Sequence, residues 1–157
     1  MSRPRYPIEE TVPHRPPMIL IDEIVGREPG RITCAVTVRP DELFFRPGRG
    51  LPVHVALEWM AQACAAYGGA DARDAGDMPR IGFLLGTRDF RATRSWLSEG
   101  GRFEIAAVLD FHDDELASFS CELRDAGDGE SVARASLTVF HPRDASSVVA
   151  SQAGAPS

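Results

Sequence analysis

The stretch VHVALEWMAQACAAYGG, residues 53–69, decides the fold. It contains no proline, it is rich in Ala, Leu and Met, and it ends on two glycines, which commonly mark the end of a helix. Apolar residues would lie on nearly all sides of this helix rather than along one stripe. We therefore predict a helix over Val53–Gly68 that is buried against the rest of the chain.

Three polar side chains interrupt the apolar helix: His54, Glu58 and Gln62. Their spacing of four residues places them on one side, in a stripe that drifts by about 40° per step. A carboxylate is costly to bury among apolar side chains unless it is paired or takes part in chemistry. We expect desolvation to raise the pKa of Glu58 and to suit it to proton exchange near neutral pH. The alternative is a structural ion, held by an arginine or by backbone amides.

Strands are predicted on both sides of the helix in the sequence, from alternating or β-branched apolar residues that end at turn signals. The six candidates are Pro17–Val25, Arg31–Arg39, Ile81–Thr93, Gly101–Phe111, Leu116–Arg124 and Val132–His141. In the fourth, alternation predicts that five apolar residues, from Phe103 to Phe111, share one face. Polar turns at 112–114 and 125–129 join the last three strands as hairpins, so this part of the sheet is antiparallel.

Such a sheet has one apolar face, and the helix is the only predicted element that can cover it. The fold class is therefore α+β, a hotdog fold in which an antiparallel β-sheet wraps around a central α-helix. We predict a single hotdog domain over residues 1–142 and a disordered tail over residues 143–157, where Ser and Ala are frequent. Hotdog domains commonly join sheet edges, so we expect a homodimer or a heterodimer with another hotdog protein.

Composition excludes several function classes. A net charge of −6 argues against a nucleic-acid partner, which would require a basic face. The three cysteines lie far apart and lack CxxC spacing, so neither a disulfide framework nor a metal site is expected. The first residues, MSRPRYPIEETVP, contain no apolar stretch that could serve as a signal peptide, and no run approaches the ~20 apolar residues that span a bilayer. We therefore expect a cytoplasmic protein that does not enter the membrane.

Two motifs in order, VPHRPPMILIDEIV (residues 12–25) and LEWMAQ (residues 57–62), resemble the β-hydroxyacyl-acyl-carrier-protein dehydratases of type II fatty acid synthesis. The resemblance extends from about Ile8 to Pro142. In that family a loop histidine and a carboxylate on the central helix form the catalytic pair, usually from opposite subunits. The carboxylate corresponds to Glu58. The corresponding loop here, FFRPGRGLP (residues 44–52), is shorter and contains no histidine.

The chain is still more similar to a divergent hotdog branch that is encoded in aryl polyene and related lipid clusters. Leu51-Pro52, Leu57–Gln62, Gly82–Arg88 and Ser118–Cys121 follow the motif of that branch. His54 stands at its aromatic position. The resemblance therefore suggests that a histidine one turn before the helix carboxylate replaces the missing loop histidine.

This resemblance implies dehydration of 3-hydroxyacyl thioesters, with His54 as base for the Cα proton and Glu58 as acid or as anchor for the β-hydroxyl. Candidate substrate-binding groups are Gln62, the backbone amides around Val53–Val55, which would face the thioester oxygen, and Arg88. Arg88 would meet an acidic carrier protein or the phosphate of its pantetheine arm. No metal or other cofactor is expected, because the substrate is carried on the phosphopantetheine of acyl carrier protein or on coenzyme A.

Two other functions stay open. Glu58 could activate a water for thioester hydrolysis, which would make the chain an acyl thioesterase. The missing loop histidine favours instead a non-catalytic hotdog subunit that partners an active dehydratase. His14, in the PHR motif, is interpreted as structural.

Overall fold

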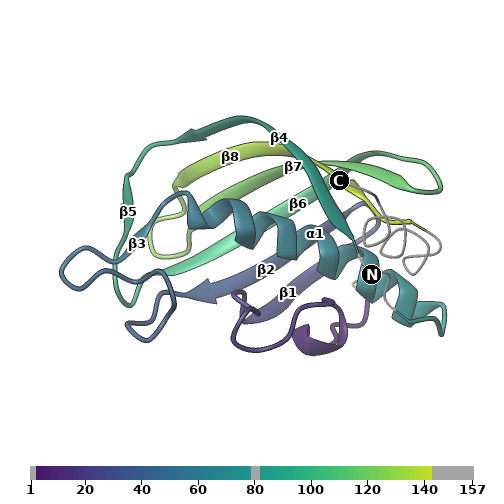
Figure 1. Ribbon diagram of the computed structural model, residues 1–157, viewed down its shortest axis with the longest axis horizontal. Helices are drawn as coiled ribbons and strands as arrows, with labels where there is room; N and C mark the ends of the chain where they lie inside the picture. Colours follow the sequence, from purple (N-terminus) through teal and green to yellow (C-terminus); the bar gives the residue numbers. More distant parts are fainter. Residues whose placement is uncertain (1–2, 79–81, 143–157) are drawn as a thin grey trace, which may run out of the picture.

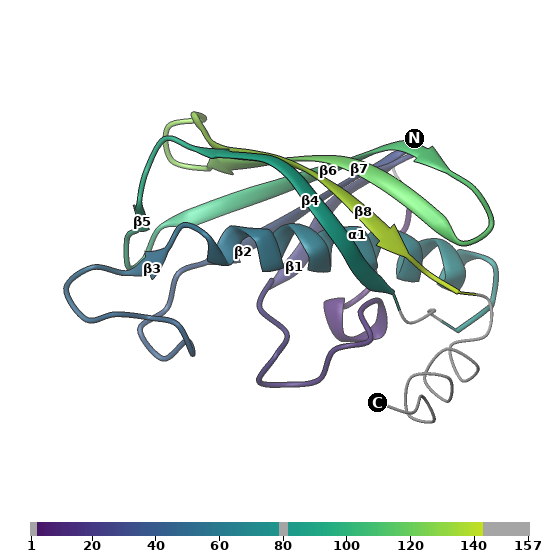
Figure 2. The same ribbon diagram turned by 45° about the horizontal axis from the view of Figure 1, so that its top comes forward.

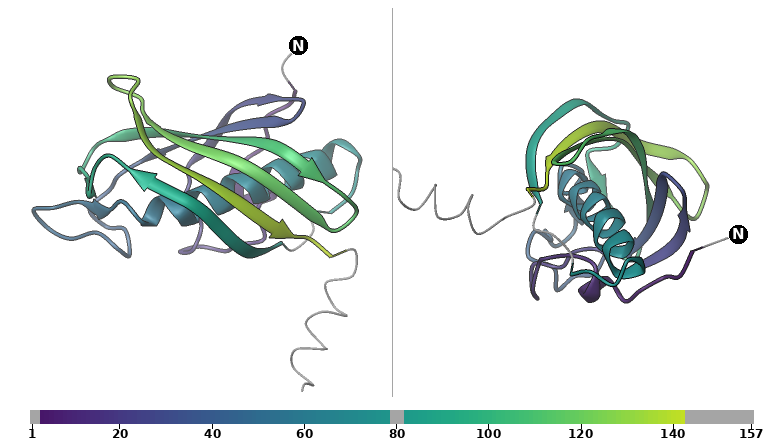
Figure 3. Two further views of the ribbon diagram at one scale, coloured as in Figure 1. Left: turned by 90° about the horizontal axis from the view of Figure 1, so that it is seen from above. Right: turned by 90° about the vertical axis from the view of Figure 1, so that its right-hand side faces the viewer.

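The computed structural model describes residues 3–78 and 82–142. Its long helix, α1 (Val55–Asp74), lies across the concave side of an antiparallel sheet of six strands (Figure 1). Viewed nearly along the helix, the sheet curves around it on one side (Figure 3). The predicted α+β hotdog fold is confirmed.

The sheet is continuous from one edge to the other although its strands come from both sides of α1 in the sequence. A short 3-10 helix, η1 (Ile8–Glu10), precedes the first strand. The strands are β1 (Glu23–Glu28), β2 (Arg31–Thr37), β3 (Leu51–Pro52), β4 (Phe83–Ala92), β5 (Trp96–Leu97), β6 (Arg102–His112), β7 (Leu116–Asp125) and β8 (Ser131–Phe140). The order in the large sheet is β1-β2-β6-β7-β8-β4, which leaves β4 at an edge. The short strands β3 and β5 pair separately, just before the start of α1 (Figure 2).

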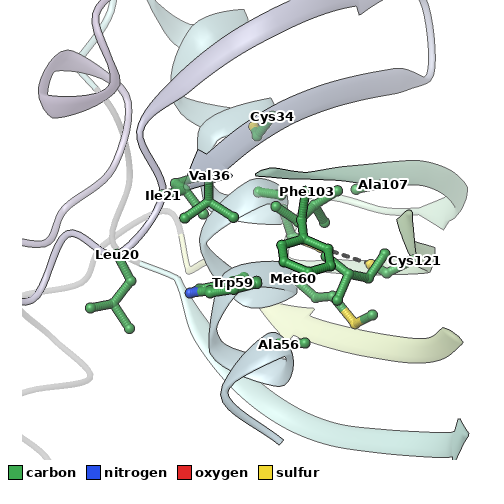
Figure 4. Close-up of a cluster of buried hydrophobic side chains, with 14 of the residues drawn as sticks. Leu20, Ile21, Cys34, Val36, Ala56, Trp59, Met60, Phe103, Ala107 and Cys121 are labelled. Carbon is green, nitrogen blue, oxygen red and sulfur yellow. Dashed lines mark hydrogen bonds between the residues drawn. The ribbon is translucent and has the colours of Figure 1, made fainter. Parts of the chain in front are cut away.

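The hydrophobic core lies between α1 and the concave face of the sheet. Trp59 is fully buried there, and its ring centroid lies 6.2 Å from that of Phe103 on β6 (Figure 4). Met60 and Cys64 come from the same side of α1 and are also buried. The Sγ of Cys64 lies 3.7 Å from the Sγ of Cys121 on β7. The side of the helix that packs on the sheet is thus wholly apolar, and the polar stripe points elsewhere.

The helix stop predicted at Gly68 and Gly69 is wrong, because α1 continues to Asp74. A Cβ atom on Gly69 would lie 1.8 Å from the carbonyl oxygen of Thr11, so the N-terminal segment approaches the helix too closely for any other residue. Arg27, almost fully buried, donates to Asp74 at 2.8 Å and so anchors the last turn. The second glycine therefore allows a close approach of two backbones and does not end the helix.

Phe111 corrects a second prediction, since its side chain is 59% exposed instead of buried. The register between β6 and β7 shifts between Leu109 and Phe111, and this irregularity turns the following side chain away from the core. The expected start of a strand at Ile81 and the expected disorder of residues 143–157 lie outside the described residues. Within 3–78 and 82–142, no helix has the length and apolar character needed to cross a bilayer.

Candidate functional site

Gln62 is a fully buried polar residue of α1 that forms three hydrogen bonds. Its Oε1 accepts from the backbone N of Leu20 at 2.8 Å, and its Nε2 donates to the carbonyl of Met18 at 2.7 Å. The same Nε2 donates to Oε1 of Glu58 at 3.2 Å. These bonds attach the segment before β1 to the helix and not to the sheet. The first strand therefore begins only at Glu23, later than its β-branched sequence indicates.

Glu58 lies one turn before Gln62 and meets a residue from the same N-terminal segment. The Nε2 of His14 is 3.5 Å from its Oε1. The Glu58 side chain is 41% exposed and that of His14 is 28% exposed, so the pair is open to solvent on one side. Both polar contacts of the carboxylate, from Gln62 and from His14, are made to Oε1. Oε2 is left without a hydrogen-bond partner among the described residues.

The pKa of Glu58 is lowered from its ordinary value, so the expected rise is wrong. The hydrogen bond from His14 is the largest cause, and the bond from Gln62 acts in the same direction against the effect of burial. Partners of the alternative kind, an arginine or backbone amides, do not hold this carboxylate in the described part of the chain. A group kept ionised at neutral pH is suited to accept a proton or a hydrogen bond and poorly suited to donate one.

His54 is the residue immediately before α1, at its N-cap, and its side chain makes no capping hydrogen bond. It is exposed. Residues four apart on a helix have Cβ atoms about 5–6 Å apart, so His54 and Glu58 face the same solvent-open side. The structure does not bring the two side chains into contact.

The other candidate substrate-binding groups lie at two places. The amide of Val53 donates to the carbonyl of Ser95 at 2.9 Å, so it is not free to bind a thioester oxygen. Val55 is the first residue of α1, and its side chain is buried. Arg88 is exposed on the edge strand β4, where its backbone pairs with Ser136 of β8.

A cavity of about 740 Å³ opens beside the C-terminal half of α1. Its walls include Ala65, Tyr67 and Gly68 from the helix and Phe119 and Val139 from the sheet. The rings of Tyr67 and Phe119 meet edge to face, with centroids 5.5 Å apart. The lining also includes the acidic residues Asp71, Asp77, Asp113 and Asp114 and the histidines His112 and His141, so the walls are part apolar and part polar. The apolar and aromatic part can receive an apolar group. Within the described ranges, no three His, Cys, Asp or Glu side chains gather closely enough to hold a metal ion.

Glu42 is an ionisable group that the sequence did not single out. It lies between β2 and β3, and burial raises its pKa to about 7, with smaller contributions in the same direction from Asp22 and Asp41. A neighbouring backbone hydrogen bond and Arg39 act against this rise. Alternation and motif patterns carry no signal for such a residue, because its burial depends on how the loop folds back.

The raised pKa of Glu42 predicts a pH-dependent stability. A carboxyl whose folded pKa lies above its unfolded value stabilises the fold at low pH, and this contribution is lost as the pH rises through about 7. We expect Glu42→Gln to remove that part of the pH dependence, so the difference in unfolding free energy between pH 5 and pH 8 should shrink. Urea unfolding of both proteins at the two pH values measures it, and an unchanged difference would contradict the raised pKa.

Known proteins place the chain in a family. The model of the ApeP-like family, described as ApeP dehydratase, matches residues 6–150. The chain belongs to the ApeP-like family. This ApeP-like chain is also 43% identical over 63 residues to the 3-hydroxyacyl-[acyl-carrier-protein] dehydratase FabZ of Anaeromyxobacter sp. (strain Fw109-5). The aligned stretch covers 37% of this chain and 40% of that relative.

Solved structures agree with the family. The ApeP-like chain is similar to a chain of the dehydratase heterocomplex ApeI:P from Xenorhabdus doucetiae, with a TM-score of 0.85 and 26% identity over 92% of this chain and 95% of the other. Zebra fish thioesterase superfamily member 2 shares the fold at a TM-score of 0.60 and 16% identity, over 76% and 80% of the two chains. The resemblance to a divergent branch of hotdog dehydratases is confirmed.

Proposed function

We propose that this ApeP-like chain acts in the dehydration of 3-hydroxyacyl thioesters and that Glu58 binds the β-hydroxyl group. One observation carries the proposal: a half-exposed carboxylate on the central helix is held by its Oε1, while its Oε2 has no hydrogen-bond partner among the described residues. The family of the chain and its partial identity with a FabZ dehydratase support the substrate class. The lowered pKa of Glu58 supports the anchor role rather than the acid role, and the sequence had left both open.

In the proposed reaction, the imidazole of His54 takes the proton from Cα of the thioester. The Cα–Cβ double bond forms, the Cβ–O bond breaks, and the hydroxyl leaves as water with the proton that the imidazolium returns. The Glu58 carboxylate accepts a hydrogen bond from the β-hydroxyl and so orients the leaving group. As the Cα proton is removed, negative charge develops on the thioester oxygen. The Val55 amide, at the start of the helix, is the donor proposed to stabilise it.

The acyl group would lie along the uncovered side of α1. Glu58 and Gly68 are separated by about 15 Å along the helix axis, at 1.5 Å per residue. The cavity beside Gly68, with Tyr67 and Phe119 among its walls, is therefore placed to receive the distal part of an acyl chain whose β-carbon lies at Glu58. We propose acyl carrier protein or coenzyme A as the carrier, with Arg88 as one contact, and no metal or other cofactor. A cytoplasmic location remains a prediction.

A paired assembly is proposed from the same side of the molecule. Leu57 and Ala61 on α1 are only partly buried, and β4 pairs on one edge alone among the described strands. Two large apolar residues of β4, Leu84 and Leu85, are 45% and 59% exposed. An open edge with exposed apolar residues favours pairing with another sheet. The partner would be a second copy or another hotdog protein, as in the similar heterocomplex.

One observation favours a second function. Residues 44–52 contain no histidine, so the chain also suits the role of a subunit that supports an active hotdog dehydratase. In that case the partner would supply the catalytic imidazole.

Purified protein, alone and with a partner hotdog dehydratase, tests these functions. An enoyl thioester and the matching saturated acyl thioester are supplied, and hydration and thiol release are followed separately. We expect hydration by the chain alone and no thiol release from the saturated compound. Thiol release would support a thioesterase and contradict the proposal. Turnover that appears only when the partner is added, above that of the partner alone, would establish the subunit role.

A further inference from the structure

The segment that carries His14 is attached to α1 on both sides of this residue. Before it, the carbonyl of Thr11 lies against the backbone of Gly69 in a contact that leaves no space for a Cβ atom. After it, the carbonyl of Met18 accepts a hydrogen bond from Gln62 at 2.7 Å. A short segment fixed at two points on the helix holds its side chains in a defined position relative to that helix.

The imidazole of His14 is turned toward one group. Its Nε2 faces Oε1 of Glu58 at 3.5 Å, whereas its Nδ1 is buried and has no hydrogen-bond partner among the described residues. A histidine whose role was only to stabilise this segment would be expected to satisfy its buried nitrogen, because an unpaired buried polar atom lowers stability. The polar contact that the structure gives His14 is the one with the carboxylate.

Two residues therefore hold the same oxygen of Glu58. His14 approaches Oε1 from the N-terminal segment, and Gln62 approaches it from the next turn of the helix at 3.2 Å. A carboxylate held twice at one oxygen has little freedom to rotate about its terminal bond. Its second oxygen, which has no hydrogen-bond partner among the described residues, is then held in a fixed direction.

We propose that His14 is a positioning residue for Glu58, which fixes Oε1 together with Gln62 and so presents Oε2 to the substrate hydroxyl. This inference rests on the proposed dehydration. His14 does not touch the reacting atoms, so it differs from the imidazole that removes the Cα proton. It also gives the PHR motif a role that its interpretation as structural did not contain.

Charge around the carboxylate agrees with this assignment. The bond from His14 is the largest cause of the lowered pKa of Glu58. Arg15, the neighbouring cation on the segment, donates instead to the carbonyls of Pro13 and His14, at 3.4 and 3.2 Å. On α1, His54 is the ionisable residue one turn before Glu58, and no contact joins them. His14 is thus the ionisable side chain that acts on this carboxylate.

Kinetics of two variants test the proposal. His14→Phe keeps a planar ring but removes the donor, and we expect kcat for hydration to fall by about tenfold to a hundredfold with KM within about twofold, the pattern of misplaced catalytic geometry. His14→Gln restores an N–H donor near the position of Nε2 and should recover most of kcat. A kcat within about twofold of wild type in His14→Phe, or a rise in KM alone, would overturn the proposal.

A second measurement separates this proposal from the proposed function. The side-chain carboxyl carbon of Glu58, assigned by its loss in Glu58→Gln, is titrated by 13C NMR in the whole protein. We expect its midpoint to rise in His14→Phe and to stay low in His14→Gln. If the wild-type chain hydrates no thioester, the dehydratase function is wrong. The titration then still tests whether His14 acts on the Glu58 carboxylate. An unchanged midpoint in His14→Phe would overturn the proposal that His14 positions Glu58.

Discussion

Replacing Glu58 by Gln is expected to lower kcat for enoyl-thioester hydration by about a hundredfold, because the group that orients the reacting oxygen loses its negative charge. The substitution preserves the shape of the side chain and removes its negative charge. Because Glu58 is 41% exposed, the fold should tolerate the change with little loss of unfolding free energy. The loss of activity would then report the carboxylate itself and not a damaged protein.

Glu99→Gln is the matched control, since Glu99 is an exposed glutamate in the turn between β5 and β6 with no ion-pair partner in the described part of the chain. Initial rates of hydration and urea unfolding curves are measured for both variants and the wild type. Activity within about twofold of wild type in Glu58→Gln would remove this residue from the mechanism. The same result with a partner dehydratase present would leave the chain as a supporting subunit.

Local periodicity explains why most of the architecture could be predicted from the sequence. Alternation over Arg31–Arg39 placed Ile32, Cys34 and Val36 on one face, and all three are buried on the concave side of the sheet. The helix was recognised because Ala, Leu and Met without proline favour this conformation wherever the segment lies in the fold. Patterns of this kind depend only on residues that are close in the sequence, so they can be recognised without knowledge of the tertiary structure.

Contacts between distant segments explain the errors at the site. The pKa of Glu58 is lowered mainly by His14, which reaches the helix because the segment around it is fixed by the bonds from Gln62 and by the close contact at Gly69. Helical spacing suggested Glu58 and His54 as a pair, and that pairing stays a prediction. Burial alone would have raised the pKa. The direction of the pKa shift therefore depends on which hydrogen-bond donor the fold brings to the carboxylate. The spacing of residues along the helix does not specify that donor.

Alanine substitutions at the two adjacent glycines of α1 should change the unfolding free energy in opposite directions. Gly69→Ala is expected to lower the unfolding free energy by about 3 kcal/mol, the upper range for overpacking, because its Cβ would lie 1.8 Å from the Thr11 carbonyl oxygen. Gly68→Ala should raise it by about 0.5–1 kcal/mol, since alanine is the better helix former and no atom lies within 4 Å of the new Cβ. Urea unfolding followed by circular dichroism measures both.

The opposite signs distinguish a close approach from helix propensity. If both variants were stabilised, the N-terminal segment would not press on the helix at Gly69. The obstacle there is a backbone oxygen, which cannot rotate aside as a side chain can, so the segment or the helix has to move. That movement would also carry His14 away from Glu58. We therefore expect Gly69→Ala to lose hydration activity even where it remains folded, whereas Gly68→Ala retains the contact at Oε1.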